Sequence, residues 1–468
     1  MKKLFVLMLC CCFVILSFGC QTAETETETN TGPFTGDDVL QTVREAYTYA
    51  FPLVMMELTM KNTTNVTERK GAPVNQFYSH RAIAAAHNRA VVRPNIDTLY
   101  SVAWLDLSDE PIIFSKPETD IYCSAAVFDA YTNCAAVLGT GGLDNGQAAV
   151  YAFCGPGYSG ETPVGAVKID LPTNMVWIIV RAEYDDNFSE IFDIQDELSL
   201  LPLSERDNPD YIPPPGTFDE EYEYVALRKI QEMDIETFFN AFNRLSVANP
   251  GTAADKPALE RFAEIGVGPG LEFSLDRFSD DIMGALSDCP ADVISKLANS
   301  GADSGYYREL NGWLYFKGNV ARFGTDYDFR AAIAIIALGA NPNEMSVYPE
   351  ASCDSDWKPL DGKNNYVIHF EPGKLPPCDG FWSITAYDGD WFLIDNPHDK
   401  YAIRGKDDLA MNPDGSLDIY LQRESPGEAL AANWLPVSDS SFQLTLRIYL
   451  PDESVLNFDW EPPAIRIF

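Results

Sequence analysis

Polar side chains border a strongly apolar run in the first quarter of the chain. Residues 99–107 are typical of a buried strand, and Asn95, Asp97 and Tyr100 lie at its start. Polar groups that a fold buries must be hydrogen-bonded or used for function. An amide, a carboxylate and a phenol can together hold a polar ligand or act as acid and base. The alternative is structural, because Asn95 and Asp97 can also fix the turn after Pro94.

A second polar set follows another expected strand, residues 122–128. Asp129, Tyr131 and Asn133 alternate along the chain, so their side chains can share one face. Such a face suits a sugar or a carboxylate, although a simple exit turn explains it equally well. We expect this set to lie beside the first one, because the two apolar strands are plausible neighbours in one sheet.

Further candidates lie in the C-terminal third. Trp382 and Tyr387 belong to a dense group of aromatic residues, and aromatic faces can pack against sugar C–H groups. Most aromatic residues of a β-domain form core instead. His398 is a loop histidine next to Asn396 and Asp399, which makes it a candidate acid or base. The carboxylates Asp97 and Asp129, with Tyr100 and His398, are the catalytic candidates.

Cofactor signals are weak. The segment 155–160 matches the dinucleotide fingerprint in its letters, but strands rather than a helix are expected after it, so no nucleotide cofactor is predicted. Aspartates are dense enough between 354 and 390 to consider calcium, yet the spacing of a calcium-binding loop is absent and a solvated acidic face is the alternative. No metal ligands are assigned.

The charge balance excludes one class of partner. The chain has a net charge of −37, whereas proteins that bind nucleic acid need a basic face. A polar small molecule or a glycan remains the expected partner, and a homo-oligomer remains open.

The first 19 residues are expected to be an export signal. Two lysines follow the first methionine, and residues 4–18 are almost wholly apolar. This run ends in Gly19-Cys20, which resembles a lipid-attachment site, and a polar tether that cannot form a core extends to residue 36. We expect an exported protein that is held on a bacterial membrane, on its periplasmic or cell-surface face, only by lipid on Cys20. Plain secretion is the alternative.

Six cysteines remain after the expected anchor. An even number in an oxidising compartment is compatible with disulfides, and buried free thiols are the alternative. The preferred pair is Cys353 with Cys378, which flank the entry to the last group of strands.

Hydrophobic periodicity divides the mature chain into three parts. Helices are expected over 37–50, over 53–60 after a kink or restart at Pro52, and over 78–88. Short strands separated by turn residues fill 99–181 and return from 365, whereas 186–345 shows helical patterns. The predicted fold is mainly β with a helical middle region, of the α+β class, and its N-terminal part is a β-sandwich.

Two ordered sets of motifs carry a resemblance to known bacterial families. Tyr49-Ala50-Phe51-Pro52, Val92 to Tyr100, Asp129 to Asn133 and Val176 to Arg181 resemble the family of domains of unknown function numbered 1254 (DUF1254). Leu338 to Asn341, Gly380 to Thr385, Asn433 to Pro436 and Arg447-Ile448-Tyr449 resemble its companion numbered 1214 (DUF1214). The resemblance implies a jelly-roll-like C-terminal sandwich and no settled activity.

The expected organisation has five segments: a signal at 1–19, a tether at 20–36, a DUF1254-like domain at 37–185, a helical linker at 186–345 and a DUF1214-like domain at 346–468. Three functions are compatible with it. The preferred one is binding of a polar small molecule or glycan by Asn95, Asp97, Tyr100, Asp129, Tyr131, Asn133, Trp382 and Tyr387. A carboxylate-dependent hydrolase, for example on glycosides, and a structural scaffold are the alternatives.

Overall fold

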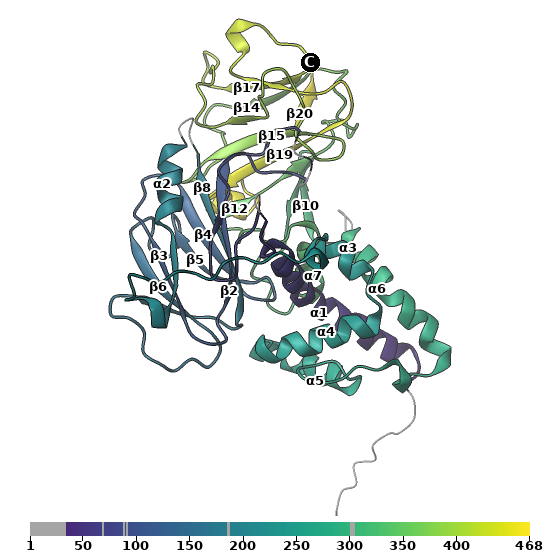
Figure 1. The fold of residues 1–468 in the computed structure, drawn as a ribbon. Helices are drawn as coiled ribbons and strands as arrows, with labels where there is room; N and C mark the ends of the chain where they lie inside the picture. Colours follow the sequence, from purple (N-terminus) through teal and green to yellow (C-terminus); the bar gives the residue numbers. More distant parts are fainter. Residues whose placement is uncertain (1–33, 68–69, 88, 90–91, 185–187, 300–304) are drawn as a thin grey trace, which may run out of the picture.

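The computed structural model describes residues 34–67, 70–87, 89, 92–184, 188–299 and 305–468. The expected export signal and Cys20 therefore lie outside the described residues. The described part forms an N-terminal β-sandwich, a group of helices and a C-terminal β-sandwich, which is uppermost in Figure 1. This arrangement confirms the predicted class, two β-rich parts with helices between them.

Two sheets pack face to face in the N-terminal sandwich. The first has the order β1 (Tyr78–Ser79), β2 (Thr98–Asp106), β8 (Met175–Glu183), β4 (Cys123–Phe128) and β5 (Cys134–Gly139). The second has the order β7 (Val167–Asp170), β6 (Ala149–Cys154), β3 (Ile112–Lys116) and β9 (Ser199–Pro202). Leu105 and Ile178 from the first sheet meet Phe114 and Phe153 from the second in the core. Because β2 and β4 are both antiparallel to β8, they run in the same direction.

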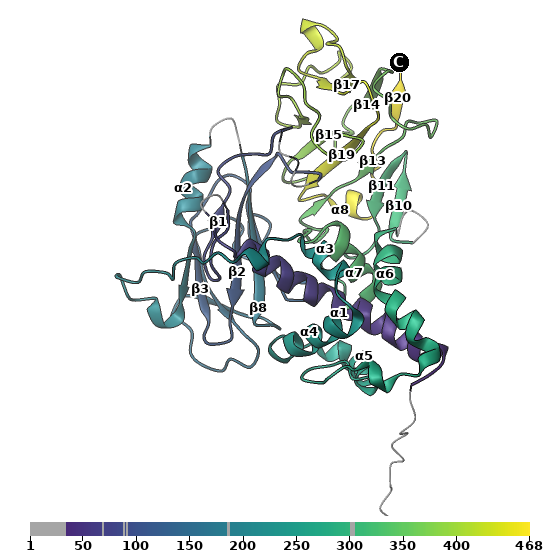
Figure 2. The same ribbon diagram turned by 45° about the vertical axis from the view of Figure 1, so that its right-hand side comes forward.

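The first helix forms the centre of the helical part. It is α1 (Asp37–Thr63), and α3 (Ala226–Gln231), α4 (Ile235–Ala248), α5 (Lys256–Glu264), α6 (Met283–Ala298) and α7 (Tyr327–Ile336) surround it (Figure 2). Every residue from Tyr47 to Leu58 is buried, as in a helix enclosed on all sides. α1 continues through Pro52, so the expected restart is wrong. Packing on all sides offsets the loss of one backbone hydrogen bond.

No helix in the described part of the chain combines the length and the apolarity needed to cross a bilayer. α1, the longest at 27 residues, carries charged side chains at both of its ends.

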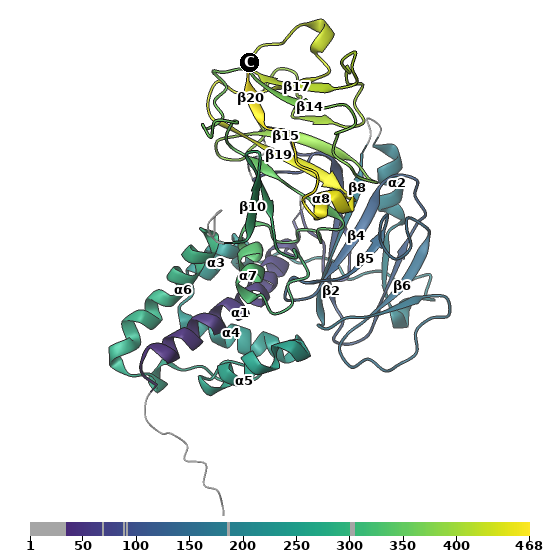
Figure 3. The ribbon, with the colours of Figure 1, turned by 180° about the vertical axis from the view of Figure 1, so that it is seen from behind.

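The C-terminal sandwich is also built from two sheets (Figure 3). The first contains β10 (Tyr307–Leu310), β11 (Trp313–Phe316), β13 (Glu350–Ala351), β19 (Phe442–Tyr449), β15 (Trp382–Asp388) and β16 (Ala402–Arg404), and β12 (Ser346–Val347) also pairs with β19. The second contains β18 (Trp434–Pro436), β17 (Leu417–Gln422), β14 (Tyr366–Phe370) and β20 (Ile465–Ile467). Ile384 and Leu446 from the first sheet share a core with Ile368 and Ile419 from the second. Two further short helices are α2 (Ser189–Glu197), between β8 and β9, and α8 (Glu453–Leu456), between β19 and β20.

Two local expectations differ from the structure. The expected helix over 78–88 is absent from its described residues, 78–87: Tyr78 and Ser79 pair with β2, and Ala84 and Ala86 pack against a cluster of the C-terminal sandwich. The expected helical range 186–345 also contains β10 and β11, which pair with each other and with β13.

The six cysteines of the described chain are free thiols, so the expected Cys353–Cys378 disulfide is wrong for this structure. The chain holds the two residues against different neighbours. Cys353 pairs with Pro359, and its sulfur lies 3.9 Å from the carbonyl oxygen of Gly312. Cys378 pairs instead with Pro451, beyond the end of β19.

We expect all six thiols to be alkylated after denaturation without reductant, and to react slowly before it. Burial raises the pKa of Cys123 to about 12, so almost none of this thiol is ionised at neutral pH. Peptide mass mapping with one reagent before unfolding and another after it measures both properties. A peptide pair linked through a disulfide would contradict the expectation.

Candidate functional site

Asp97 lies where the two sandwiches meet. Its side chain is 1 % exposed, directly before β2. One carboxylate oxygen accepts a hydrogen bond from the hydroxyl of Ser383 at 2.6 Å, and the other accepts one from Nε of Arg404 at 3.2 Å. Ser383 and Arg404 are a cross-strand pair of β15 and β16. The C-terminal sheet therefore presents two adjacent donors to this carboxylate.

Asn95 connects the same two domains through its amide group. Its side-chain oxygen accepts from the backbone N–H of Asp97 at 2.8 Å, which is the turn expected from the sequence. Its nitrogen donates to the hydroxyl of Tyr449 on β19 at 2.7 Å and to that of Tyr100 on β2 at 3.0 Å. Asn95 and Tyr100 keep partly exposed side chains. Asn95 thus has a structural role and remains accessible.

Arg181 occupies the centre of this region. It is 5 % exposed and lies opposite Tyr100 in the β2–β8 ladder, with its guanidinium 5.3 Å from the Tyr100 ring centroid. Its terminal nitrogens donate to the side-chain oxygen of Asn341 at 2.6 Å and to the carbonyl oxygen of Gly339 at 2.7 Å. Its Nε has no hydrogen-bond partner within the described chain. These partners are neutral, so they supply no opposite charge.

Arg447 is a second buried arginine at the interface, 4 % exposed on β19. It donates to the hydroxyl of Thr385 at 2.8 Å and to that of Tyr387 at 2.6 Å. Tyr387 in turn donates to the carbonyl oxygen of Pro94 at 2.9 Å. Tyr387, a ligand candidate from the sequence, therefore holds the segment that carries Asn95.

We call this group the interdomain cluster. Its members come from both sandwiches: Asn95, Asp97, Tyr100, Arg181, Tyr348, Ser383, Tyr387, Arg404, Arg447 and Tyr449.

The charges of the interdomain cluster are unevenly paired. Arg404 has Asp97 as its ion-pair partner, and the neighbouring Arg93 has Glu350 at 2.8 Å. Arg181 and Arg447 have no carboxylate oxygen within 4.0 Å among the described residues. A buried guanidinium without a counter-charge is costly, so an anion beside it would be strongly favoured.

Phenol groups surround the unpaired Arg181. Tyr348 accepts from Ser346 at 2.7 Å and lies 3.5 Å from the Tyr449 hydroxyl. Burial raises the pKa of Tyr449, and the neighbouring Tyr348 and Tyr100 add to the effect. Tyr449 therefore stays protonated at neutral pH; its hydroxyl oxygen accepts from Asn95 and Tyr348, and its proton can be donated to a ligand. Phenol donors beside a guanidinium are suited to hold a carboxylate.

The second polar set lies at the other end of the sheet. β2 begins opposite Glu183 and β4 ends opposite Trp177, six residues apart on β8, which is about 20 Å. Asn95 and Asp97 precede β2, whereas Asp129 follows β4. Since these two strands run in the same direction, their polar ends point apart. The expected single cluster is therefore wrong, and Asp97 and Asp129 are too far apart for a glycosidase pair.

Asp129 forms a turn instead of a site. Its carboxylate accepts from the backbone N–H groups of Tyr131 and Asn133 and from the Asn133 amide, at 2.8 to 3.3 Å. Burial raises the pKa of Asp129, and the hydrogen bonds from Asn133 oppose that shift. Tyr131 donates to the carbonyl oxygen of Asn249 at 3.1 Å, toward the helices.

Two other candidates from the sequence lie apart from the interdomain cluster. Trp382 is 6 % exposed, and its ring centroid lies 5.9 Å from that of Phe370, so it belongs to the core. His398 is exposed beside Trp434, with a ring-centroid distance of 5.0 Å.

The acidic residues considered for calcium take part in turns and ion pairs. Asp354 accepts from the backbone of Asp356 and Lys358, and Asp388 pairs with Arg89 at 2.9 Å. Within the described ranges, no group of histidine, cysteine and acidic side chains has an arrangement that could hold a metal ion.

Sequence reasoning missed the arginines and Ser383. Arg181 lies near the end of an apolar strand, and Arg447 lies within another. A charged residue in a buried strand is rare, and this pattern could have indicated both arginines from the sequence. Their pairing with residues near Asp97 depends on contacts between distant parts of the chain.

Two segments of the chain match known families. Residues 74–202 match the family described as "Protein of unknown function (DUF1254)", and residues 345–453 match "Protein of unknown function (DUF1214)". A segment that matches DUF1254 is therefore followed along the chain by one that matches DUF1214. All the residues of the interdomain cluster lie in these two matched segments.

Two solved structures are similar to this chain to different degrees. The VPA0106 protein from Vibrio parahaemolyticus is 20 % identical, with a TM-score of 0.69 over 92 % of this chain and 99 % of that chain. An uncharacterized protein from Burkholderia cenocepacia is 15 % identical, with a TM-score of 0.43 over 92 % and 94 % of the two chains. No curated protein matches the chain. The first likeness supports the fold alone.

Proposed function

We propose that this protein binds a small molecule with a carboxylate or similar anionic group at the interdomain cluster. One observation carries the proposal: Arg181 is buried without an acidic partner among the described residues, and its Nε is unpaired. A carboxylate is the natural partner of a guanidinium, through two parallel hydrogen bonds.

The side chains around Arg181 leave it accessible to a ligand and offer polar groups that can select one. Asn95, Tyr100 and Tyr348 are partly exposed, so solvent reaches the group that encloses Arg181. Their amide and phenol groups can bind the polar remainder of a ligand. Because these residues come from both domains, a bound ligand would contact both and would strengthen their association.

A melting screen at low ionic strength tests the proposal, since salt weakens charge interactions. We expect some members of a panel of mono- and dicarboxylates and sugar acids to raise the melting temperature, whereas neutral polyols of equal size do not. A ligand at about 100 times its dissociation constant adds about 2.7 kcal/mol, which is a shift of several degrees. A panel without any such shift would overturn the proposal.

The scaffold remains a second candidate, and the Asp97 contacts favour it. Asp97 and Ser383 are almost fully buried, and their hydrogen bond closes the interface between the domains. Buried residues that are hydrogen-bonded across an interface hold the two domains together whether or not a ligand binds nearby. The hydrolase alternative is not supported, because its two carboxylates, Asp97 and Asp129, lie at opposite ends of the sheet.

We also propose export and lipid attachment at Cys20, on the basis of the basic start, the apolar run and the Gly19-Cys20 junction. Intact-mass analysis should find a chain that begins at an acylated Cys20, and Cys20→Ser should move the protein into the soluble fraction. A mature wild-type chain without lipid would contradict this expectation.

A further inference from the structure

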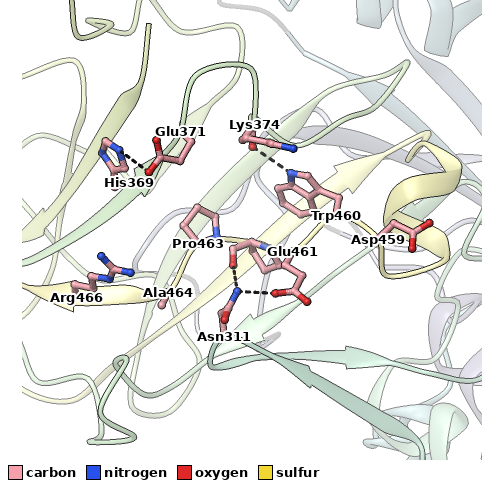
Figure 4. A pocket seen from close by; sticks show the side chains of 11 residues that line it. Asn311, His369, Glu371, Lys374, Asp459, Trp460, Glu461, Pro463, Ala464 and Arg466 are labelled. Carbon is pink, nitrogen blue, oxygen red and sulfur yellow. Dashed lines mark hydrogen bonds and ion pairs between the residues drawn. The ribbon is translucent and has the colours of Figure 1, made fainter. Parts of the chain in front are cut away.

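The C-terminal sandwich contains a separate cavity of about 450 Å³ (Figure 4). It is lined by the segment between α8 and β20, by the end of β14 and by the turn between β10 and β11. None of the residues of the interdomain cluster lines it. The polar lining consists mainly of His369, Glu371, Lys374, Asp459, Glu461 and Arg466.

Hydrogen bonds from neighbouring elements hold the floor of this cavity. The amide of Asn311 donates to Glu461 and to the carbonyl oxygen of Pro462, both at 3.1 Å. Trp313 donates through its indole N–H to the carbonyl oxygen of Pro463 at 2.9 Å. The segment is therefore fixed before any ligand arrives, which lowers the entropic cost of binding.

A tryptophan and an oriented histidine complete the walls. The indole N–H of Trp460 donates to the carbonyl oxygen of Lys374 at 3.1 Å. His369 on β14 lies opposite Asp418 on β17, with Nδ1 2.6 Å from the carboxylate. Its Nε2 lies 3.6 Å from Glu371, too far for a hydrogen bond, and remains available to a ligand.

The charged groups of the cavity are mixed in sign. Lys374 and Arg466 have no carboxylate oxygen within 4.0 Å among the described residues, and the carboxylates of Glu371, Asp459 and Glu461 outnumber them. An anion would therefore meet net repulsion. A neutral ligand with many hydroxyl groups can donate to the carboxylates and accept from the two cations.

We infer that this cavity binds a neutral mono- or disaccharide. Its carboxylates, cations and imidazole are suited to hydroxyl groups, and the prolines beside Trp460 offer an apolar surface for sugar C–H groups. The site is independent of the anion site proposed at the interdomain cluster, since the two share no residue.

Saturation-transfer NMR with maltose, cellobiose and N-acetylglucosamine tests the inference on the wild-type protein and two variants. We expect at least one of these sugars to bind, and the double variant Lys374→Ala with Arg466→Ala to weaken its affinity at least tenfold. Both side chains are exposed, so the melting temperature should change little. Arg423→Ala, an exposed arginine of the same sandwich outside the cavity, is the matched control.

Two outcomes would overturn the inference: none of the sugars binds, or the double variant binds them as the wild type does. Binding of glycine betaine in place of the sugars would identify a site for zwitterions. Loss of carboxylate binding at Arg181 would leave the sugar result unchanged, so the two proposals fail separately.

Discussion

Replacing Asp97 with alanine is expected to lower the free energy of unfolding by about 3 kcal/mol. The change removes the acceptor of the buried Ser383 hydroxyl and the ion-pair partner of Arg404. Breaking a buried pair leaves the remaining partner desolvated and unsatisfied. The estimate is at the low end for such pairs, because the Arg404 side chain is 19 % exposed and part of its charge is screened. Urea denaturation measures the loss.

Asp356→Ala is the matched control for this prediction. Asp356 lies in the C-terminal part of the chain, and its ion pair with Lys358 is 67 % exposed on both sides. We expect a change below about 0.5 kcal/mol for this exposed pair. Equal effects of the two substitutions would show that Asp97 does not fasten the interface.

Arg181→Met should abolish the stabilisation by carboxylates. Methionine fills a similar volume without a charge, so the variant keeps an apolar side chain in the same place. Two buried oxygen acceptors, of Asn341 and Gly339, lose their donor, and the variant is therefore less stable without ligand. The informative quantity is the shift of the melting temperature between ligand-bound and ligand-free samples of each protein.

Arg423→Met serves as its control, because this arginine is 61 % exposed and does not belong to the interdomain cluster. It should retain the full carboxylate shift of the wild type. A normal shift in Arg181→Met would remove Arg181 from the binding site, whatever the stability of the variant.

The period of the apolar residues predicted many of the elements correctly. β2 and β4 are largely buried strands, and their bounds differ from the expected 99–107 and 122–128 by one residue at most. The order of strands in each sheet could not be derived, because periodicity assigns faces and not neighbours. The expected meeting of Asp97 with Asp129 failed for this reason: β8 lies between β2 and β4.

Part of the candidate site could likewise be predicted from the sequence, and part of it could not. Asn95, Asp97, Tyr100 and Tyr387 were found from their residue types, and all four belong to the interdomain cluster. The arginines were missed, because the sequence does not reveal that Arg181 lacks a carboxylate partner. That property results from contacts between segments about 160 residues apart in the chain.

Anomalous scattering from a brominated carboxylate tests the central claim most directly. Crystals grown with 4-bromobenzoate, whose aryl bromide does not alkylate thiols, should show a bromine peak beside Arg181, with the carboxylate about 3 Å from the guanidinium and close to Tyr100 and Asn95. The same experiment on Arg181→Met should show no peak at this position. A wild-type peak only at other places, or none at a concentration that raises the melting temperature, would contradict the proposed anion site.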